Sequence, residues 1–317
     1  MAFAFTKEGK IPFQPPGTDV SGSTYYKIFG DLSIGAPPVV ILHGGPGVGH
    51  EYLLTFANLW HEYGLPVIFY DQVGCASSTH LPQMAGDKDF WQESLFVAEL
   101  QNLLDHFSLC DANGPGFHLY GHSFGGRLAA AFATSRPQGL QRLVLASALA
   151  STDLSIRGNE LRRHELPTQT REVLEKCVAN RDFGSAAFKE ASMIYNKTFF
   201  CREEPMPELL MPALKHMSET AVMETILGPS IHLNPGEGSM SGWTCIPRLP
   251  QIKVPTLVYN AEFDTSHDIS QVPFFELIPR VRWITFAKGS HMCHLEREVK
   301  DKVLKVVGDF LIQDRKN

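Results

Sequence analysis

The feature that most constrains the fold is the alternation of short apolar runs with helical patterns along the 317-residue chain. Continuous apolar runs bounded by Gly or Pro are typical of parallel strands that are covered on both faces. Such runs lie at 39–42, 67–70, 117–120, 143–146, 256–259 and 282–286. Between them, helical patterns lie at 91–107, 126–135 and 296–313. Strands that alternate with helices predict an α/β fold built on a doubly wound, mostly parallel sheet.

The alternation stops between residues 151 and 247, where the sequence has no good strand run. Helical patterns occupy 157–164, 169–180, 185–195 and 207–227 instead, after which the strands resume. A helical insertion that returns to the same sheet is typical of a cap over a pocket. We therefore predict a core in two parts, 1–150 and 248–317, with an inserted helical cap at 151–247.

Composition and charge exclude several classes of protein. Hydrophobic residues make up 44% of the chain, which is enough for a sizeable core and excludes disorder as the main state. The net charge is −6 and no stretch concentrates Lys and Arg, so we expect no nucleic-acid partner. The apolar runs are far shorter than the roughly 18 residues of a membrane span. Charges near the start disfavour a secretory signal, and six scattered cysteines indicate reduced thiols, so a cytoplasmic location is expected.

The strongest chemical signal is the segment Gly121-His-Ser123-Phe-Gly125. It follows a predicted strand and opens a predicted helix, which is the context that a GxSxG nucleophile turn requires. Glycines are needed because the turn is too sharp for a Cβ, and the turn exposes the Ser123 hydroxyl. The pattern predicts that Ser123 is a catalytic nucleophile.

A serine nucleophile needs a base, and the base needs a carboxylate to orient it. In this strand–turn–helix arrangement the acid and the histidine follow the serine in that order. Asp264 and His291 each follow a late strand run, where loops leave the carboxyl edge of the sheet. The competing acids are Asp268 and Glu262, and the competing bases are His294 and His267; each is out of register with its strand end.

The glycine-rich segment His43-Gly-Gly-Pro-Gly47 directly follows the run at 39–42. The N–H groups of Gly44 or Gly45, together with that of Phe124, could stabilise a developing oxyanion. Such a donor contributes roughly 3–4 kcal/mol to acyl transfer.

His267 and Asp268 could suggest a metal site, but no third metal ligand stands at suitable spacing. We therefore expect a hydrolase that works through an acyl-enzyme, without a metal or cofactor.

The sequence resembles the proline iminopeptidase family of α/β hydrolases. The similar segments are His43–Gly47, Asp71-Gln-Val-Gly-Cys-Ala-Ser-Ser78, Gly121–Gly126 and the late Asp264 and His291, together with Cys201–Glu208 and Gly228–Ser230 in the predicted cap. The resemblance implies an α/β-hydrolase fold and a cytosolic serine peptidase. Such an enzyme would remove N-terminal proline or other small residues, or would be a related amino-acid amidase.

The sequence departs from this family where the family holds the substrate's α-ammonium group. The resemblance places acidic residues directly after the Gly-Pro-Ser segment and directly after the catalytic Asp, but Ile231 and Thr265 stand there. Neither side chain can pair with a cation, and loss of a buried ionic partner costs about 3–5 kcal/mol. Glu204, beside Glu203, is the candidate replacement, although exposed acids are usually only solvated.

A second departure lies in the segment 71–78, which lacks the family's Arg at Val73 and its second Gly at Ala76. The predicted cap is also rich in soft apolar side chains, such as Phe200, Met217 and Met223, some of which could line a pocket.

Three functions stay open at this point. The chain could be an iminopeptidase or amidase with an amine anchor elsewhere, or an esterase or amidase for a neutral specialised metabolite. It could also use the pocket without hydrolysis, for cyclase or lyase chemistry or for ligand binding. The expected partner is a small molecule or short peptide.

Overall fold

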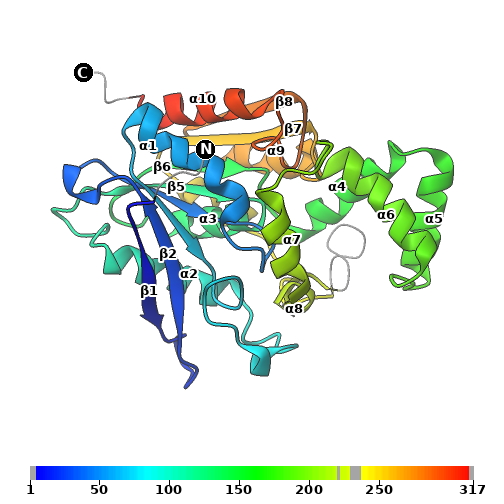
Figure 1. Cartoon of the computed structure of the whole chain (residues 1–317), viewed down its shortest axis with the longest axis horizontal. Coiled ribbons are helices and arrows are strands. Elements are labelled where there is room, and N and C mark those ends of the chain that lie inside the picture. Colours follow the sequence, from blue (N-terminus) through cyan, green and yellow to red (C-terminus); the bar gives the residue numbers. More distant parts are fainter. Residues whose placement is uncertain (1–4, 220–221, 229–236, 314–317) are drawn as a thin grey trace.

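A single eight-stranded sheet forms the centre of the molecule in the computed structural model, which describes residues 5–219, 222–228 and 237–313 (Figure 1). The strand order is β1-β2-β4-β3-β5-β6-β7-β8. The strands are β1 (Lys7–Phe13), β2 (Gly22–Phe29), β3 (Val39–Leu42), β4 (Val67–Asp71), β5 (Phe117–His122), β6 (Leu140–Ala146), β7 (Thr256–Phe263) and β8 (Val281–Ser290).

The strands from β4 to β8 pair in parallel, whereas β1 and β2 pair antiparallel at one edge. The predicted mostly parallel α/β sheet is therefore confirmed, and all six apolar runs are strands. The sequence analysis missed β1 and β2. Their burial alternates along much of each strand, because an antiparallel edge keeps one face in solvent and so lacks a continuous apolar run.

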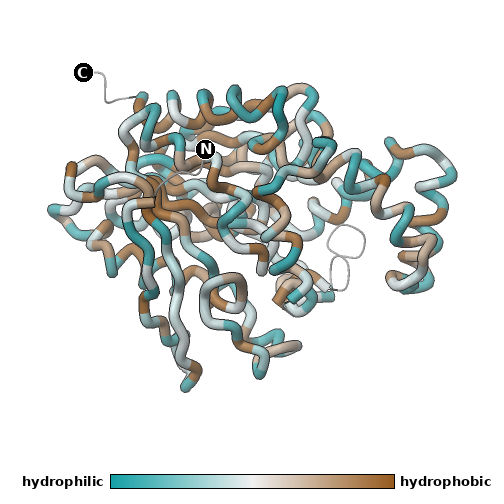
Figure 2. The backbone as a smooth tube through the Cα atoms, viewed as in Figure 1, coloured by the Kyte–Doolittle hydropathy of each residue, from teal (hydrophilic) through white to brown (hydrophobic). Residues whose placement is uncertain are grey.

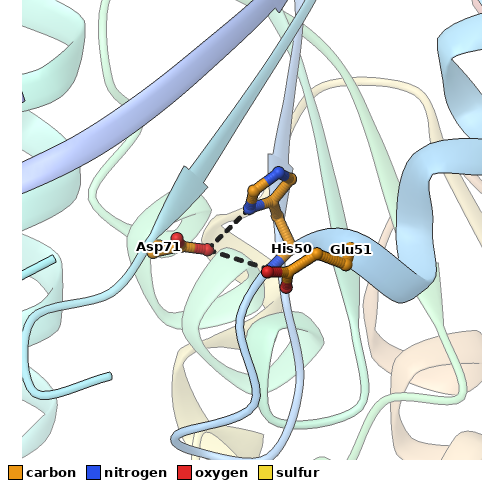
Figure 3. A group of neighbouring side chains, drawn as sticks. All are labelled: His50, Glu51 and Asp71. Atoms are coloured by element: carbon orange, nitrogen blue, oxygen red, sulfur yellow. Dashed lines mark hydrogen bonds and ion pairs between the residues drawn. The ribbon is translucent and has the colours of Figure 1, made fainter. Parts of the chain in front are cut away.

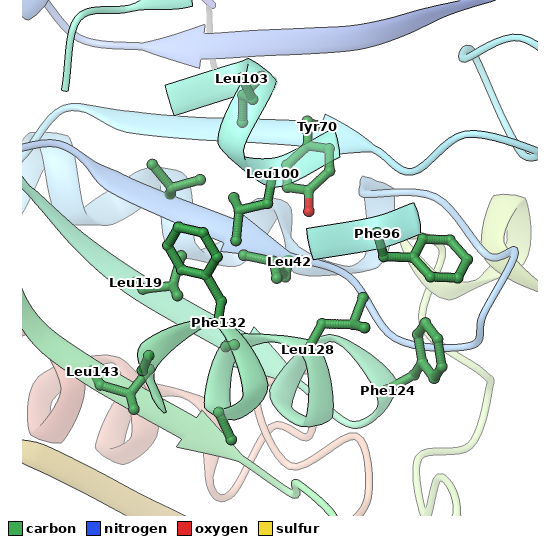
Figure 4. Close-up of a cluster of buried hydrophobic side chains, with 14 of the residues drawn as sticks. Leu42, Tyr70, Phe96, Leu100, Leu103, Leu119, Phe124, Leu128, Phe132 and Leu143 are labelled. Carbon is green, nitrogen blue, oxygen red and sulfur yellow. The ribbon is translucent and has the colours of Figure 1, made fainter. Parts of the chain in front are cut away.

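Two hydrophobic cores cover the two faces of the sheet. In β3, Val40 and Leu42 face one core and Val39 and Ile41 face the other, as the period-2 geometry of a strand dictates. The first core includes α2 (Glu93–His106), α3 (Phe124–Thr134) and α9 (Asp268–Leu277); the second includes α1 (Asn58–Tyr63) and α10 (Lys300–Leu311). Figure 4 shows side chains of α2 and α3 packed against the sheet, and Figure 2 shows the apolar strands at the centre.

The region between β6 and β7 is helical, as predicted. It contains α4 (Thr152–His164), α5 (Thr168–Ala179), α6 (Ala186–Phe199), α7 (Leu210–Glu219) and α8 (Val222–Leu227). Within the predicted helix at 207–227, the described residues Leu210–Glu219 and Val222–Leu227 are helical. Helices α5 and α6 project away from the sheet (Figure 1) and share a small core of their own around Leu174 and Tyr195. The division into two core parts and a cap stays a prediction.

Four short 3₁₀ turns complete the described secondary structure: η1 (Leu32–Ile34), η2 (Glu51–Ala57), η3 (Pro82–Met84) and η4 (Ile246–Gln251). No helix within the described residues is long and apolar enough to cross a bilayer.

Candidate active site

Ser123 lies at the sharp turn between β5 and α3, where its backbone has φ 54° and ψ −117°. A positive φ is unusual for a residue with a side chain and marks a strained turn. The turn requires glycine on both sides. A Cβ on Gly121 would lie 2.3 Å from the Gly125 carbonyl oxygen, and one on Gly125 would lie 2.3 Å from that of Leu42. The local sequence therefore has a steric reason for the GxSxG pattern.

The structure brings His291 and Asp264 together at the carboxyl edge of the sheet. His291 Nδ1 lies 2.7 Å from Asp264 Oδ1, and both side chains are buried. Asp264 also accepts hydrogen bonds from the Ser147 hydroxyl at 2.5 Å and from the Ser266 N–H at 2.8 Å. These hydrogen bonds fix the position of the carboxylate, and its contact with Nδ1 sets the orientation of the His291 imidazole.

Arg162 of α4 fastens the Asp264 loop from the helical region. Its Nε donates to the Asp264 carbonyl oxygen at 2.7 Å, and its Nη2 donates to the Glu262 carbonyl oxygen at 2.8 Å. The side chain is buried and pairs with Glu165 at 2.9 Å. Arg162 is therefore a positioning residue for the loop that carries the acid.

A buried hydrogen-bond chain joins the glycine-rich loop to the His291 loop. The Gly44 N–H donates to Tyr52 Oη at 2.7 Å, so the Tyr52 hydroxyl donates in turn to His122 Nδ1 at 2.9 Å. The remaining nitrogen of His122 then donates to the His291 carbonyl oxygen at 3.1 Å. Burial holds the pKa of His122 well below its ordinary value, so the ring stays neutral as this chain requires.

The competing acids and bases have other contacts. Asp268 accepts from Asn260, Glu262 accepts from the Lys288 N–H, and His267 accepts from the Ile269 N–H at the start of α9. His294 packs against the aromatic rings of Tyr52 and Phe56, and burial lowers its pKa to about 3. These contacts occupy the four alternatives, whereas Asp264 and His291 contact each other at the cavities that Ser123 lines.

The three predicted oxyanion donors differ in their contacts. The Gly44 N–H is occupied by Tyr52, so in this structure it does not serve as a donor to the site. Within the described part of the chain, no acceptor takes the N–H of Gly45 or of Phe124. Gly45 and Phe124 both line the cavity that contains Ser123. The geometry therefore favours Gly45 and Phe124 over Gly44.

Two cavities have Ser123 and His291 in their walls. The first is the more polar of the two and is lined by Gly45, Ser123, Phe124, Arg127, Leu149, Thr152, Ser155, Asn159, Ile226, Leu227, Met240, Ser241, Thr265, Ser266 and His291. The second is mainly apolar and is lined by Gly44, Gly45, Val48, Tyr52, His122, Ser123, Phe200, Leu210, Ala213, Leu214, Met217, Met223, His291 and Met292. We call them the polar cavity and the apolar cavity. Both include residues of the helical region 151–247.

The predicted substrate-binding residues have different outcomes. Thr265 is buried and lines the polar cavity. Ile231 lies outside the described residues. Glu204 is misplaced by the sequence analysis: its side chain is 80% exposed, pairs with Lys197 at 3.3 Å and lines neither cavity. Its neighbour Glu203 pairs with Arg297. A surface acid that water and a lysine already solvate cannot replace a buried amine anchor.

His50, Glu51 and Asp71 form a group whose potential ligand atoms lie within 4.8 Å of one another (Figure 3). Asp71 Oδ1 already accepts from both the backbone N–H and Nδ1 of His50, and Asp71 Oδ2 accepts from the Ser77 N–H. The carboxylate is thus satisfied by the protein itself. This contact ties the loop after β3 to the end of β4, and we assign it no metal.

Sequence analysis missed Tyr52, His122, Ser147 and Arg162, which act through buried hydrogen bonds that no local pattern announces. It also missed Arg127. The available signal there was a lone charge within the otherwise apolar helix Phe124–Thr134.

Comparison with known proteins identifies the class. The model of the α/β hydrolase fold family matches residues 37–298, so the chain is an α/β hydrolase. A proline iminopeptidase of Lactiplantibacillus plantarum is 31% identical over 284 residues, which cover 86% of this chain and 92% of the relative. A proline iminopeptidase of Saccharolobus solfataricus is 30% identical over 292 residues, covering 91% and 89%.

Solved structures agree with the sequence relatives. The crystal structure of VinJ has a TM-score of 0.88 at 34% identity and covers 98% of this chain and 99% of its own. The crystal structure of the Mycobacterium smegmatis proline iminopeptidase has a TM-score of 0.85 at 32% identity, covering 96% and 98%. The chain belongs to the proline iminopeptidase-like family of α/β hydrolases.

Proposed function

We propose that the protein is a serine hydrolase that cleaves an amide or ester of a small molecule or short peptide through an acyl-enzyme. Ser123 is the nucleophile, His291 the general base and then acid, and Asp264 the residue that orients His291. The observation that carries the proposal is the 2.7 Å contact between His291 and Asp264 at the cavities that Ser123 lines. The three relatives named proline iminopeptidase agree with this class.

The reaction follows from these positions. His291 takes the proton of the Ser123 hydroxyl as Oγ attacks the substrate carbonyl, and the Asp264 carboxylate stabilises the resulting imidazolium. The N–H groups of Gly45 and Phe124 hold the negative oxygen of the tetrahedral intermediate. His291 then protonates the leaving group. Water repeats the sequence on the acyl-enzyme and regenerates Ser123.

The helical region 151–247 acts as a cap in this proposal. It supplies Thr152, Ser155 and Asn159 to the polar cavity and α7 to the apolar cavity. A substrate at Ser123 is therefore enclosed between the sheet edge and these helices, which orients its carbonyl and excludes water.

We further propose that hydrolysis does not depend on a free amine in the substrate. Among the described residues, no Asp or Glu lines either cavity, and Thr265 stands beside Asp264 where an acid would be needed. The residues 229–236, which are not described, contain no Asp or Glu in their sequence. An α-ammonium group would thus lose its hydration without gaining a carboxylate partner.

The test compares a prolyl or alanyl arylamide, its N-acetylated form and a matching aryl ester. We expect the acetylated amide or the ester to be hydrolysed at least as well as the free amine. Preference for the free amine by a hundredfold or more, about 2.7 kcal/mol, would contradict this part of the proposal.

Labelling of Ser123 by a fluorophosphonate tests the triad separately. We expect labelling of the native protein and none of Ser123→Ala, with Ser155→Ala as a matched control that keeps the label. A native protein that neither labels nor hydrolyses any probe would favour a non-hydrolytic use of the pocket.

A further inference from the structure

Arg127 of α3 lies one helical turn after Ser123 and lines the polar cavity. Its side chain is only 2% exposed. The guanidinium carbon is 4.6 Å from the centre of the Trp243 ring and 5.9 Å from that of the Phe124 ring. These contacts hold the planar group in a fixed place without neutralising it.

The guanidinium has no carboxylate partner among the described residues. Its Nη1 contacts the Met240 sulfur at 3.6 Å, and its Nε is buried with no hydrogen-bond partner. The nearby acid Glu93 is already committed, because it accepts two hydrogen bonds from Arg248 and one from the Trp243 indole. A buried cation with unused donors is costly unless an anion completes its environment.

Glu99 provides an instructive contrast within the same protein. It is also fully buried without a cationic partner, but burial raises its pKa to about 8, so it can become neutral. Its oxygens accept hydrogen bonds from the Thr24 hydroxyl and the Val73 N–H. Arg127 cannot become neutral in the same way. Burial lowers its pKa only to about 10, so the side chain stays charged near neutral pH.

We propose that Arg127 binds a carboxylate group of the substrate in the polar cavity, directly beside the bond that Ser123 attacks. The inference rests on the proposed hydrolase function and narrows its substrate class to carboxylate-bearing amides or esters. One carboxylate balances one guanidinium, and its two oxygens match the two-pronged geometry of the group. A phosphate monoester, with a charge of about −1.5 to −2, would leave uncompensated charge in a buried place.

The rest of the polar cavity suits an anion. Asn159 Oδ1 accepts the Tyr195 hydroxyl at 2.6 Å, which leaves the amide NH₂ of Asn159 as a donor. Ser155 and Ser241 also line this cavity and offer hydroxyl donors. Among the described lining residues there is no Asp or Glu to repel a carboxylate.

Two pairs of ester probes test the proposal without assuming which side of the scissile bond reaches Arg127. The first pair is the 4-nitrophenyl monoester of glutaric acid and its carboxamide. The second pair is 4-carboxyphenyl butanoate and 4-carbamoylphenyl butanoate. The kcat/KM ratio of carboxylate to carboxamide is measured for the native protein, Arg127→Met and Arg127→Lys. Comparing ratios across variants cancels the intrinsic reactivity of the esters.

We expect the ratio for at least one pair to fall about tenfold or more in Arg127→Met and to recover in part in Arg127→Lys, which restores the charge but not the planar fork. Arg282→Met, which removes an exposed arginine of β8 outside both cavity linings, should leave the ratio unchanged. If Arg127 only supports packing, Arg127→Met lowers both members of a pair equally, and the proposal is wrong. It is equally wrong if the native protein and Arg127→Lys give the same ratios in both pairs as Arg127→Met.

A binding experiment separates failure of this inference from failure of the hydrolase proposal. In Ser123→Ala, 4-carboxyphenyl butanoate should bind at least tenfold more tightly than its carboxamide, and Arg127→Met in that background should remove the difference. If the native protein is not labelled by the fluorophosphonate, the hydrolase proposal alone is refuted. Equal affinities for the two esters in Ser123→Ala, with labelling intact, would refute the carboxylate proposal alone.

Discussion

The polar and apolar cavities meet at Ser123 and His291 but differ in almost every other respect. The polar cavity takes a buried guanidinium from α3 and hydroxyl and amide donors from α4. The apolar cavity is built largely from α7 and contains Leu, Ala and Met side chains. The proposed nucleophile and base are therefore shared by the two cavities, whereas the residues proposed to select a substrate are divided between them.

This division has a physical consequence for substrate recognition. An apolar pocket distinguishes substrates weakly, by about 1–3 kcal/mol per methylene group, whereas a site of buried polar groups rejects ligands that leave those groups unpaired. We infer that the polar cavity determines which chemical class is accepted, and that the apolar cavity adjusts the preferred size. The predictions that follow test how far the two sides are independent.

The largest effect is expected at His291, which lines both cavities, through its contact with Asp264. Asp264→Asn should lower kcat by roughly 10³- to 10⁴-fold, because the imidazole loses the carboxylate that fixes its tautomer and stabilises its charge. The loss should be the same for apolar esters and for carboxylate-bearing esters. Steady-state kinetics with both kinds of ester measure it.

Asp268→Asn is the matched control for Asp264→Asn, since Asp268 is an exposed acid four residues further along, at the start of α9. It should retain near-native kcat. If folded Asp264→Asn keeps more than a tenth of the native activity, another acid orients His291, and the assignment of Asp264 is wrong.

The second prediction concerns Glu99, the buried acid that contrasts with Arg127; of these two residues, only Arg127 lines a cavity. The folded-state pKa of Glu99 is raised from 4.5 to about 8 by burial, so the folded protein binds the extra proton. The stability from this proton is complete below pH 4.5 and is lost as the pH rises through 8. The free energy of unfolding should fall by on the order of 3 kcal/mol between pH 5 and pH 8 on this account.

Glu99→Gln should remove most of that slope, since glutamine keeps the shape of the carboxyl group but cannot ionise. Urea unfolding at several pH values measures the slope for both proteins. Glu62→Gln, at an exposed position, is the control and should keep the native slope. An unchanged slope in Glu99→Gln would mean that Glu99 is ionised in the folded protein, which would weaken its contrast with Arg127.

The third prediction concerns the hydrogen-bond chain behind the apolar cavity. Tyr52→Phe leaves the Gly44 N–H without its acceptor and His122 Nδ1 without its donor, so stability should fall by about 1–3 kcal/mol. Tyr63→Phe is the matched control, because the Tyr63 hydroxyl makes only long, exposed contacts of 3.4 and 3.5 Å. Urea unfolding at constant pH compares the two variants.

Tyr52→Phe also tests how the buried hydrogen-bond chain supports the reaction. Because Gly44 would be released while Gly45 and Phe124 keep their positions, we expect kcat to change by less than tenfold. A loss near that of Asp264→Asn would indicate that the chain positions His291 more strongly than its single contact to the His291 carbonyl suggests.

The difference between the cavities also explains what sequence could and could not predict. The strand before Ser123 is buried on both faces, so apolar residues predominate in it, and the glycines around Ser123 are required by steric contacts within the turn itself. Features that have such short-range causes can be recognised in a short stretch of sequence. The strands β1 and β2 were not predicted because edge strands mix polar and apolar residues. Helix α9 was not predicted because Pro273 interrupts its helical pattern.

The selective residues of the site depend on contacts between distant parts of the chain. Arg127 owes its character to Trp243 and Met240, more than 100 positions away, which bury it without neutralising it. Glu204 looked like an anchor because it is an acid in the helical region, but its side chain lies in solvent. The burial of a side chain and the residues that contact it decide such roles, and neither can be predicted from a short segment of sequence.

The smallest effect should come from the apolar cavity alone. Met217 lines it from α7 and is only partly buried, so Met217→Trp narrows the cavity without disturbing a close-packed core. Hydrolysis of 4-nitrophenyl octanoate should fall about tenfold relative to the acetate, within the 1–3 kcal/mol typical of such pockets. Met211→Trp, on the exposed face of the same helix, should leave this ratio unchanged. The carboxylate-to-carboxamide ratio should not move in either variant. If Met217→Trp alters that ratio as strongly as Arg127→Met does, the two cavities act as one site, and charge and size are not selected separately.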